Sequence, residues 1–74
     1  MFDRIRVDLK GMTNNGDIKL HGISCFGKVS VFSGGGVLRI QINNKDLLML
    51  PTVVPILEVS EILDLTKNMF DWNY

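Results

Sequence analysis

The chain has 74 residues, of which 46% are hydrophobic and 22% are charged, and its formal net charge is zero. A length of this order fits one small domain, residues 1–74, in which good packing or self-association must compensate for a small core. The single Cys25 excludes an intrachain disulfide, and Cys25 and His21 together are too few ligands for a closed structural zinc site.

Other function classes are disfavoured by the same composition. No apolar stretch approaches the roughly 20 residues of a membrane span, so we expect no membrane partner. The first residues are charged and alternating, unlike a signal peptide, and an unpaired cysteine fits a reducing compartment. The sequence therefore predicts a cytoplasmic protein, and we expect neither a metal nor another cofactor.

The zero net charge hides an uneven distribution along the chain. Residues 1–45 carry seven basic and three acidic side chains, a formal charge of +4. Residues 46–74 carry one basic and five acidic side chains, a formal charge of −4. The chain is therefore dipolar, with a basic first part and an acidic second part.

Two alternating segments at the start of the chain predict a β-hairpin. Residues 4–13 place apolar and charged side chains on opposite faces, as the period of a strand requires. The turn Asn14-Asn15-Gly16-Asp17 contains Asn-Gly, the strongest short hairpin signal, and residues 17–24 form the return strand. The register that follows pairs Val7 with Ser24, Leu9 with Gly22 and Gly11 with Leu20.

A second hairpin is predicted around Ser33-Gly34-Gly35-Gly36, between strands over residues 27–33 and 37–43. With Gly34-Gly35 as the turn, Val31 faces Leu38. The side chains that then face the core are Val29, Val31, Leu38 and Ile40. The outer face receives Lys28, Ser30, Phe32, Val37, Arg39 and Gln41.

The turn Asn43-Asn44-Lys45-Asp46 leads into a last strand over residues 46–50. With Asn44-Lys45 at the centre of the turn, Ile40 faces Met49, and Leu48 and Leu50 point outward. A strand that is apolar on both sides is usually covered on both sides.

A helix is predicted over about residues 55–70, after Pro51 ends the last strand. Leu65 and Trp72 lie beside its apolar stripe and widen the apolar arc to roughly 200°, more than a surface helix needs. The predicted fold is α+β: a five-strand antiparallel β-meander, or a small SH3-like or OB-like barrel, with one C-terminal α-helix.

Catalytic chemistry has few candidate residues in this chain. His21 and Cys25 are four residues apart, about 13 Å on one extended strand, which is too far for a nucleophile and its base. Gly34-Gly35-Gly36 leads into a strand, whereas phosphate-binding glycine loops usually lead into a helix. We therefore expect no enzyme.

An apolar patch on the outer face supports a protein–protein interaction module instead, such as a small adaptor, inhibitor or assembly subunit that self-associates. Its helix or a curled sheet could also cover this patch. The aromatic tail of residues 69–74 could dock on the chain's own sheet or on a partner. The predicted contact residues are Phe32, Val37, Leu48, Leu50, Leu65 and Trp72.

The alternative function is binding of single-stranded nucleic acid. Basic strand residues beside Phe32 could attract phosphates while the aromatic ring stacks on a base. The zero net charge weakens this interpretation, because such proteins are usually basic. The residues concerned are Arg4, Arg6, Lys10, Lys19, Lys28 and Arg39.

Overall fold

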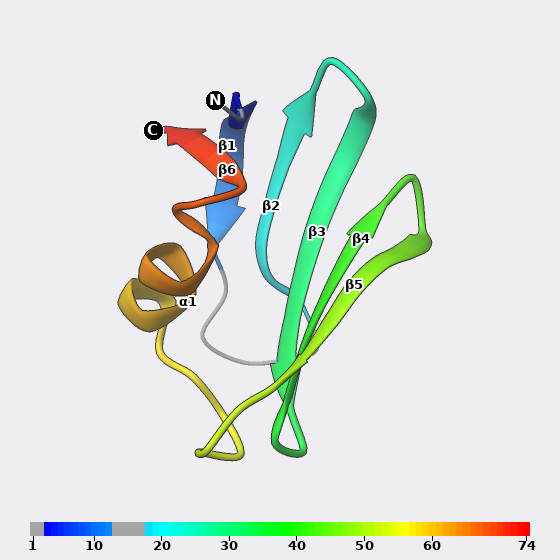
Figure 1. Ribbon diagram of the computed structural model, residues 1–74. Coiled ribbons are helices and arrows are strands. Elements are labelled where there is room, and N and C mark those ends of the chain that lie inside the picture. The colour runs from blue at the N-terminus through cyan, green and yellow to red at the C-terminus, as the bar shows by residue number, and fades with distance from the viewer. Residues whose placement is uncertain (1–2, 13–17) are drawn as a thin grey trace.

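A computed structural model describes residues 3–12 and 18–74 of the protein (Figure 1). Over these residues it is a curled, mostly antiparallel sheet with one short helix against it. The elements in chain order are β1 (Ile5–Met12), β2 (Ile18–Ser24), β3 (Gly27–Gly34), β4 (Val37–Ile42), β5 (Lys45–Pro51), α1 (Val59–Thr66) and β6 (Phe70–Asn73). The predicted turn Asn14–Asp17 lies outside the described residues.

The α+β class is confirmed, but the sheet has six strands rather than five. Strands β1 to β5 form the predicted antiparallel meander, and β6 adds to the far side of β1 in parallel, so that the order is β5-β4-β3-β2-β1-β6. The sheet curls into a half-barrel and leaves β5 and β6 as its two edges.

The core lies on the face of the sheet that α1 covers, called here the inner face. Fully or almost fully buried apolar side chains come from β1 to β4, from the segment before α1, from α1 itself and from β6. Burial of a side chain of this size contributes roughly 1.5–3 kcal/mol. The buried set is Val7, Leu20, Val29, Val31, Leu38, Ile40, Leu57, Ile62 and Phe70.

The register of the first hairpin is confirmed at its open end and wrong near the turn. Leu9 pairs with Gly22 as predicted, but Gly11 pairs with His21 rather than Leu20. A bulge between Leu9 and Gly11 inserts Lys10 as an extra residue, and alternation alone does not reveal such an insertion.

The glycine hairpin turns one residue later than predicted. Gly35 and Gly36 have φ angles of 63° and 78°, as a type I′ turn requires of both central residues. Val31 therefore faces Ile40 rather than Leu38. Because the pairing shifts by two residues, every side chain keeps its predicted face, and the predicted core residues of this hairpin are buried.

The prediction for β5 is wrong about which of its side chains face outward. The turn is formed by Asn43 and Asn44, with φ angles of 53° and 67°, and a bulge follows it in the pairing of β4 with β5. Ile40 therefore pairs with Leu48 rather than Met49. Leu48 and its neighbour Leu50 pack against the core instead of pointing outward.

Helix α1 is much shorter than the predicted helix over residues 55–70. It begins after Glu58, which forms a capping box with Glu61. The segment before it is not helical: residues 53–56 form a run of bends, and the backbone N–H of Leu57 donates to Ser33 Oγ in the core at 2.8 Å. The helix ends at Thr66, where the Thr66 hydroxyl donates to the carbonyl of Ile62 at 2.8 Å.

Strand β6 was not predicted, and it fixes the position of the aromatic tail of residues 69–74. Its residues pair in parallel with β1, so that Phe70 lies beside Ile5 and Trp72 beside Val7. The indole Nε1–H of Trp72 donates to the Thr66 hydroxyl at 2.9 Å. The tail thus docks on the chain's own sheet.

The Thr66–Trp72 hydrogen bond is testable by Thr66→Val, which keeps the shape of the side chain and removes its oxygen. We expect the free energy of unfolding to fall by about 1–3 kcal/mol, because the Trp72 indole N–H loses its acceptor. Urea denaturation followed by fluorescence of Trp72, the single tryptophan of the chain, measures the change. Ser60→Ala, at an exposed position of α1, is the control; equal stability of the two variants would contradict the assignment.

Candidate protein-binding surfaces

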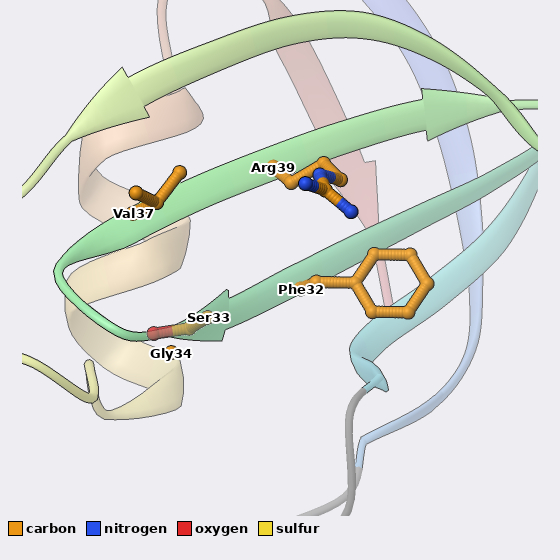
Figure 2. Close-up of a pocket in the computed structure, with 5 residues that line it drawn as sticks. All are labelled: Phe32, Ser33, Gly34, Val37 and Arg39. Carbon is orange, nitrogen blue, oxygen red and sulfur yellow. The ribbon is translucent and has the colours of Figure 1, made fainter.

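The outer face of the sheet, opposite α1, carries an apolar patch over β3, β4 and β5. Figure 2 shows Phe32, Val37 and Arg39 pointing to the same side of these strands, with α1 behind them. With Ser33 and Gly34 they line a hollow of about 370 Å³. The surface is therefore hollowed, and its lining combines the apolar side chains of Phe32 and Val37 with the charged Arg39.

Strand pairing extends this surface to the edge of the sheet. Arg39 pairs with Met49 and Val37 pairs with Pro51, so that both β5 residues lie beside the hollow. The side chain of Met49 is 49% exposed. We call Phe32, Val37, Met49 and Pro51 the outer patch. Arg39 crosses it, with its Nε 3.7 Å from Asp46 Oδ1.

Strand β5 is itself an unpaired edge of the sheet as described. It pairs with β4 on one side and has no neighbour on the other. Its centre is Leu47-Leu48-Met49-Leu50, and Leu47 is 48% exposed. Apolar edge strands offer free backbone N–H and C=O groups to another strand unless charges or prolines block them. Here Lys45, Asp46 and Pro51 stand only at the ends of the strand.

The six predicted contact residues do not form one surface. Phe32 and Val37 lie together on the outer face, whereas Leu48, Leu50 and Trp72 pack against the core on the inner side. Leu65 lies apart from them on α1 and is 48% exposed. Met49 and Pro51 were missed because a bulge between Ile40 and Gln41 in the pairing with β5 shifts the register by one residue and reverses the faces of β5. Two consecutive asparagines, which tolerate positive φ, could have placed the turn, but alternation does not reveal the bulge.

The predicted basic surface is interrupted by carboxylates. Arg4 lies 4.0 Å from Asp71, Arg6 lies 3.5 Å from Asp8 and Arg39 lies 3.7 Å from Asp46. Lys19 is 7% exposed, whereas Lys10 and Lys28 are exposed. Such exposed ion pairs add little to stability, but each acid opposes a nearby phosphate. Nucleic-acid binding stays a prediction, with weaker electrostatic support than the sequence suggested.

The residues considered for catalysis remain dispersed. Cys25 is exposed in the turn between β2 and β3, and His21 lies within β2, beside Ser30 and Gly11. The glycine tip leads into β4, as expected from the sequence. Residues 3–12 and 18–74 contain no group of three or more His, Cys, Asp or Glu side chains able to hold a metal ion.

Comparisons with protein-family models, with curated proteins and with solved structures found no match to this chain. Within residues 3–12 and 18–74 the single helix, α1, has eight residues, far fewer than a membrane-spanning helix requires. What the protein does is therefore inferred from its own surfaces.

One carboxylate on the outer face has a perturbed pKa. Asp8 Oδ1 accepts a hydrogen bond from the side-chain amide of Asn73 at 2.9 Å, and Arg6 Nε lies 3.5 Å from the same oxygen. The Asn73 hydrogen bond is the main reason that the pKa of Asp8 is lowered, and the positive charge of Arg6 adds to it. This contact also joins the end of β6 to β1.

Asn73→Ala is therefore expected to raise the pKa of Asp8 toward its ordinary value. In the native protein the Asp8 carboxylate stabilises the fold at pH values above its unfolded pKa, and this contribution is lost as the pH falls through the lowered folded pKa. NMR titration of the Asp8 side-chain carboxyl measures the shift. A pKa that is unchanged in Asn73→Ala would show that the amide does not hold the carboxylate.

Proposed function

We propose that the protein is a non-enzymatic protein–protein interaction module, an adaptor, inhibitor or assembly subunit, which self-associates through the β5 edge and the outer patch. The observation that carries this proposal is the unpaired, apolar edge strand β5 beside the outer patch. Strand addition to such an edge gains affinity from backbone hydrogen bonds and specificity from alternate side chains.

In a two-fold symmetric dimer, the free backbone N–H and C=O groups of β5 in each copy pair with those of β5 in the other copy. Antiparallel pairing of two β5 strands about Met49 places Leu48 of one copy opposite Leu50 of the second copy, both on the inner face. Met49 then meets Met49 of the second copy on the outer face. Because the axis runs through the sheet, the outer patches of the two copies lie on the same side and adjoin each other.

The expected affinity is moderate. A seven-residue strand and a small patch form an interface smaller than the standard size for stable complexes, which is about 800 Å² on each partner. We therefore expect association at micromolar concentrations. An exchangeable dimer also leaves the same edge available to a strand of another protein.

The test is Met49→Lys, which brings two positive charges together at the centre of the proposed interface. By light scattering at micromolar concentration, the native chain is expected to be a dimer or larger and the variant a monomer. Ile23→Lys is the matched control, because Ile23 is 47% exposed on the same face but lies in β2, away from the edge.

Thermal unfolding shows that both variants are folded before their masses are compared. A native chain that stays monomeric across the micromolar range would overturn self-association. A dimer that survives Met49→Lys but not Ile23→Lys would place the interface elsewhere on the sheet.

A further inference from the structure

A second hollow, with a volume of about 470 Å³, is lined by the segment that follows β5 and by helix α1. Leu57, which is 5% exposed, forms its floor. Val53, Val54 and Leu65 are apolar residues of its lining, and Glu61 and Asp64 are its charged residues. We call this hollow the α1 groove.

The apolar lining of the α1 groove is open to solvent. Val53 is fully exposed, Leu65 is 48% exposed and Val54 is 38% exposed. Ile56, next to Leu57 in the chain, is 63% exposed. So many large apolar side chains on one short segment and the facing helix are typical of an interaction site rather than of an ordinary loop.

The loop that forms one side of the groove is held in place by hydrogen bonds at both ends. The N–H of Thr52 donates to the carbonyl of Gly36 at 2.8 Å, and the N–H of Gly36 donates to the carbonyl of Pro55 at 3.2 Å. Within the loop the Thr52 hydroxyl donates to the carbonyl of Val54 at 2.7 Å. A groove fixed in this way loses little conformational entropy when it binds a ligand.

The negative charge of the groove determines which kind of ligand it favours. Its lining contains two carboxylates, Glu61 and Asp64, and no basic side chain. Lys67 lies 3.0 Å from Asp64, whereas no ion pair within the described part of the chain reaches Glu61. The groove therefore attracts cations and repels phosphate groups.

We propose that the α1 groove binds a peptide segment of another protein, in which apolar side chains are flanked by lysine or arginine. The apolar side chains fill the space above Leu57 between Val54 and Leu65, and the cations lie against Glu61 and Asp64. This site is separate from the proposed β5–β5 contact, with which it shares only Pro51. It does not depend on self-association.

The test uses the full chain, isotope-labelled and in its Met49→Lys form, so that the proposed β5–β5 dimer does not compete with the peptide. Its backbone amide signals are followed by NMR during titration with the capped hexapeptide Lys-Lys-Leu-Leu-Lys-Lys. Two further hexapeptides replace either the lysines by glutamates or the leucines by serines. We expect the shifts to centre on residues 53–65, with affinity for the first peptide at least about tenfold higher than for either comparator.

Variants of the lining locate the binding. Leu65→Ser is expected to lower the affinity for the first peptide about threefold to tenfold, because the groove loses an apolar side chain that contacts the leucines. Ile23→Ser is the matched control, since Ile23 and Leu65 are 47% and 48% exposed. Glu61→Gln keeps an acceptor for the capping box and removes the charge, so that it is expected to weaken binding mainly at low salt.

Three outcomes would each overturn the proposal: equal affinity for the three peptides, shifts centred outside the groove, or undiminished binding to Leu65→Ser. NMR shifts over the basic strands with the glutamate peptide, without shifts in the groove with the lysine peptide, would also overturn it. The protein would then attract acidic rather than basic peptides. Failure of the dimer test leaves these outcomes unchanged, because every titration uses the Met49→Lys chain.

Discussion

The hydrogen bond from the Trp72 indole to the Thr66 hydroxyl holds the end of α1 against the strand that follows it. A helix of eight residues has little stability in water by itself, so its position depends on contacts at its ends. At the other end the Leu57 N–H donates to the buried Ser33 hydroxyl. Two hydroxyls, one on a strand and one on the helix, thus fix α1 against the inner face. The α1 groove and the uncovered outer face both follow from that placement.

The shortness of α1 also explains the surplus of apolar surface in the second half of the chain. Over residues 55–72 the apolar side chains are too numerous for one helix face because they belong to three different elements. Phe70 and Trp72 are strand residues against β1, while Ile56 precedes the helix and remains 63% exposed. Only Leu65 is an exposed large apolar residue of α1 itself. The surplus is therefore divided between an extra strand and an open groove.

Sequence reasoning succeeded where an error in register preserved the faces of the strands. The two-residue shift in the glycine hairpin left Val31 and Leu38 inside, whereas the one-residue error after Asn43 reversed Leu48 and hid the exposure of Met49. Bulges caused the one-residue errors in the pairing of β1 with β2 and of β4 with β5, and alternation does not encode them. Strand β6 was missed because Met69 and Phe70 fit a helical stripe as well as they fit the start of a strand. Phe32 and Val37 could thus be predicted as a surface, but the edge that extends it could not.

The fold brings the basic and acidic parts of the chain together on the sheet but not on the helix. The sheet places β5 beside β4 and β6 beside β1, so that Asp46 reaches Arg39 and Asp71 reaches Arg4. Much of the +4 charge of residues 1–45 is thereby matched by acids from the second part of the chain. Helix α1 receives no such compensation from the sheet: Lys67 pairs with Asp64, and Glu61 has no ion pair among the described residues. The Glu61 carboxylate is therefore available to a basic partner, whereas Arg4, Arg6 and Arg39 already lie beside carboxylates that oppose a phosphate. These local charges are the electrostatic support for the proposed binding of a basic peptide on the helix side.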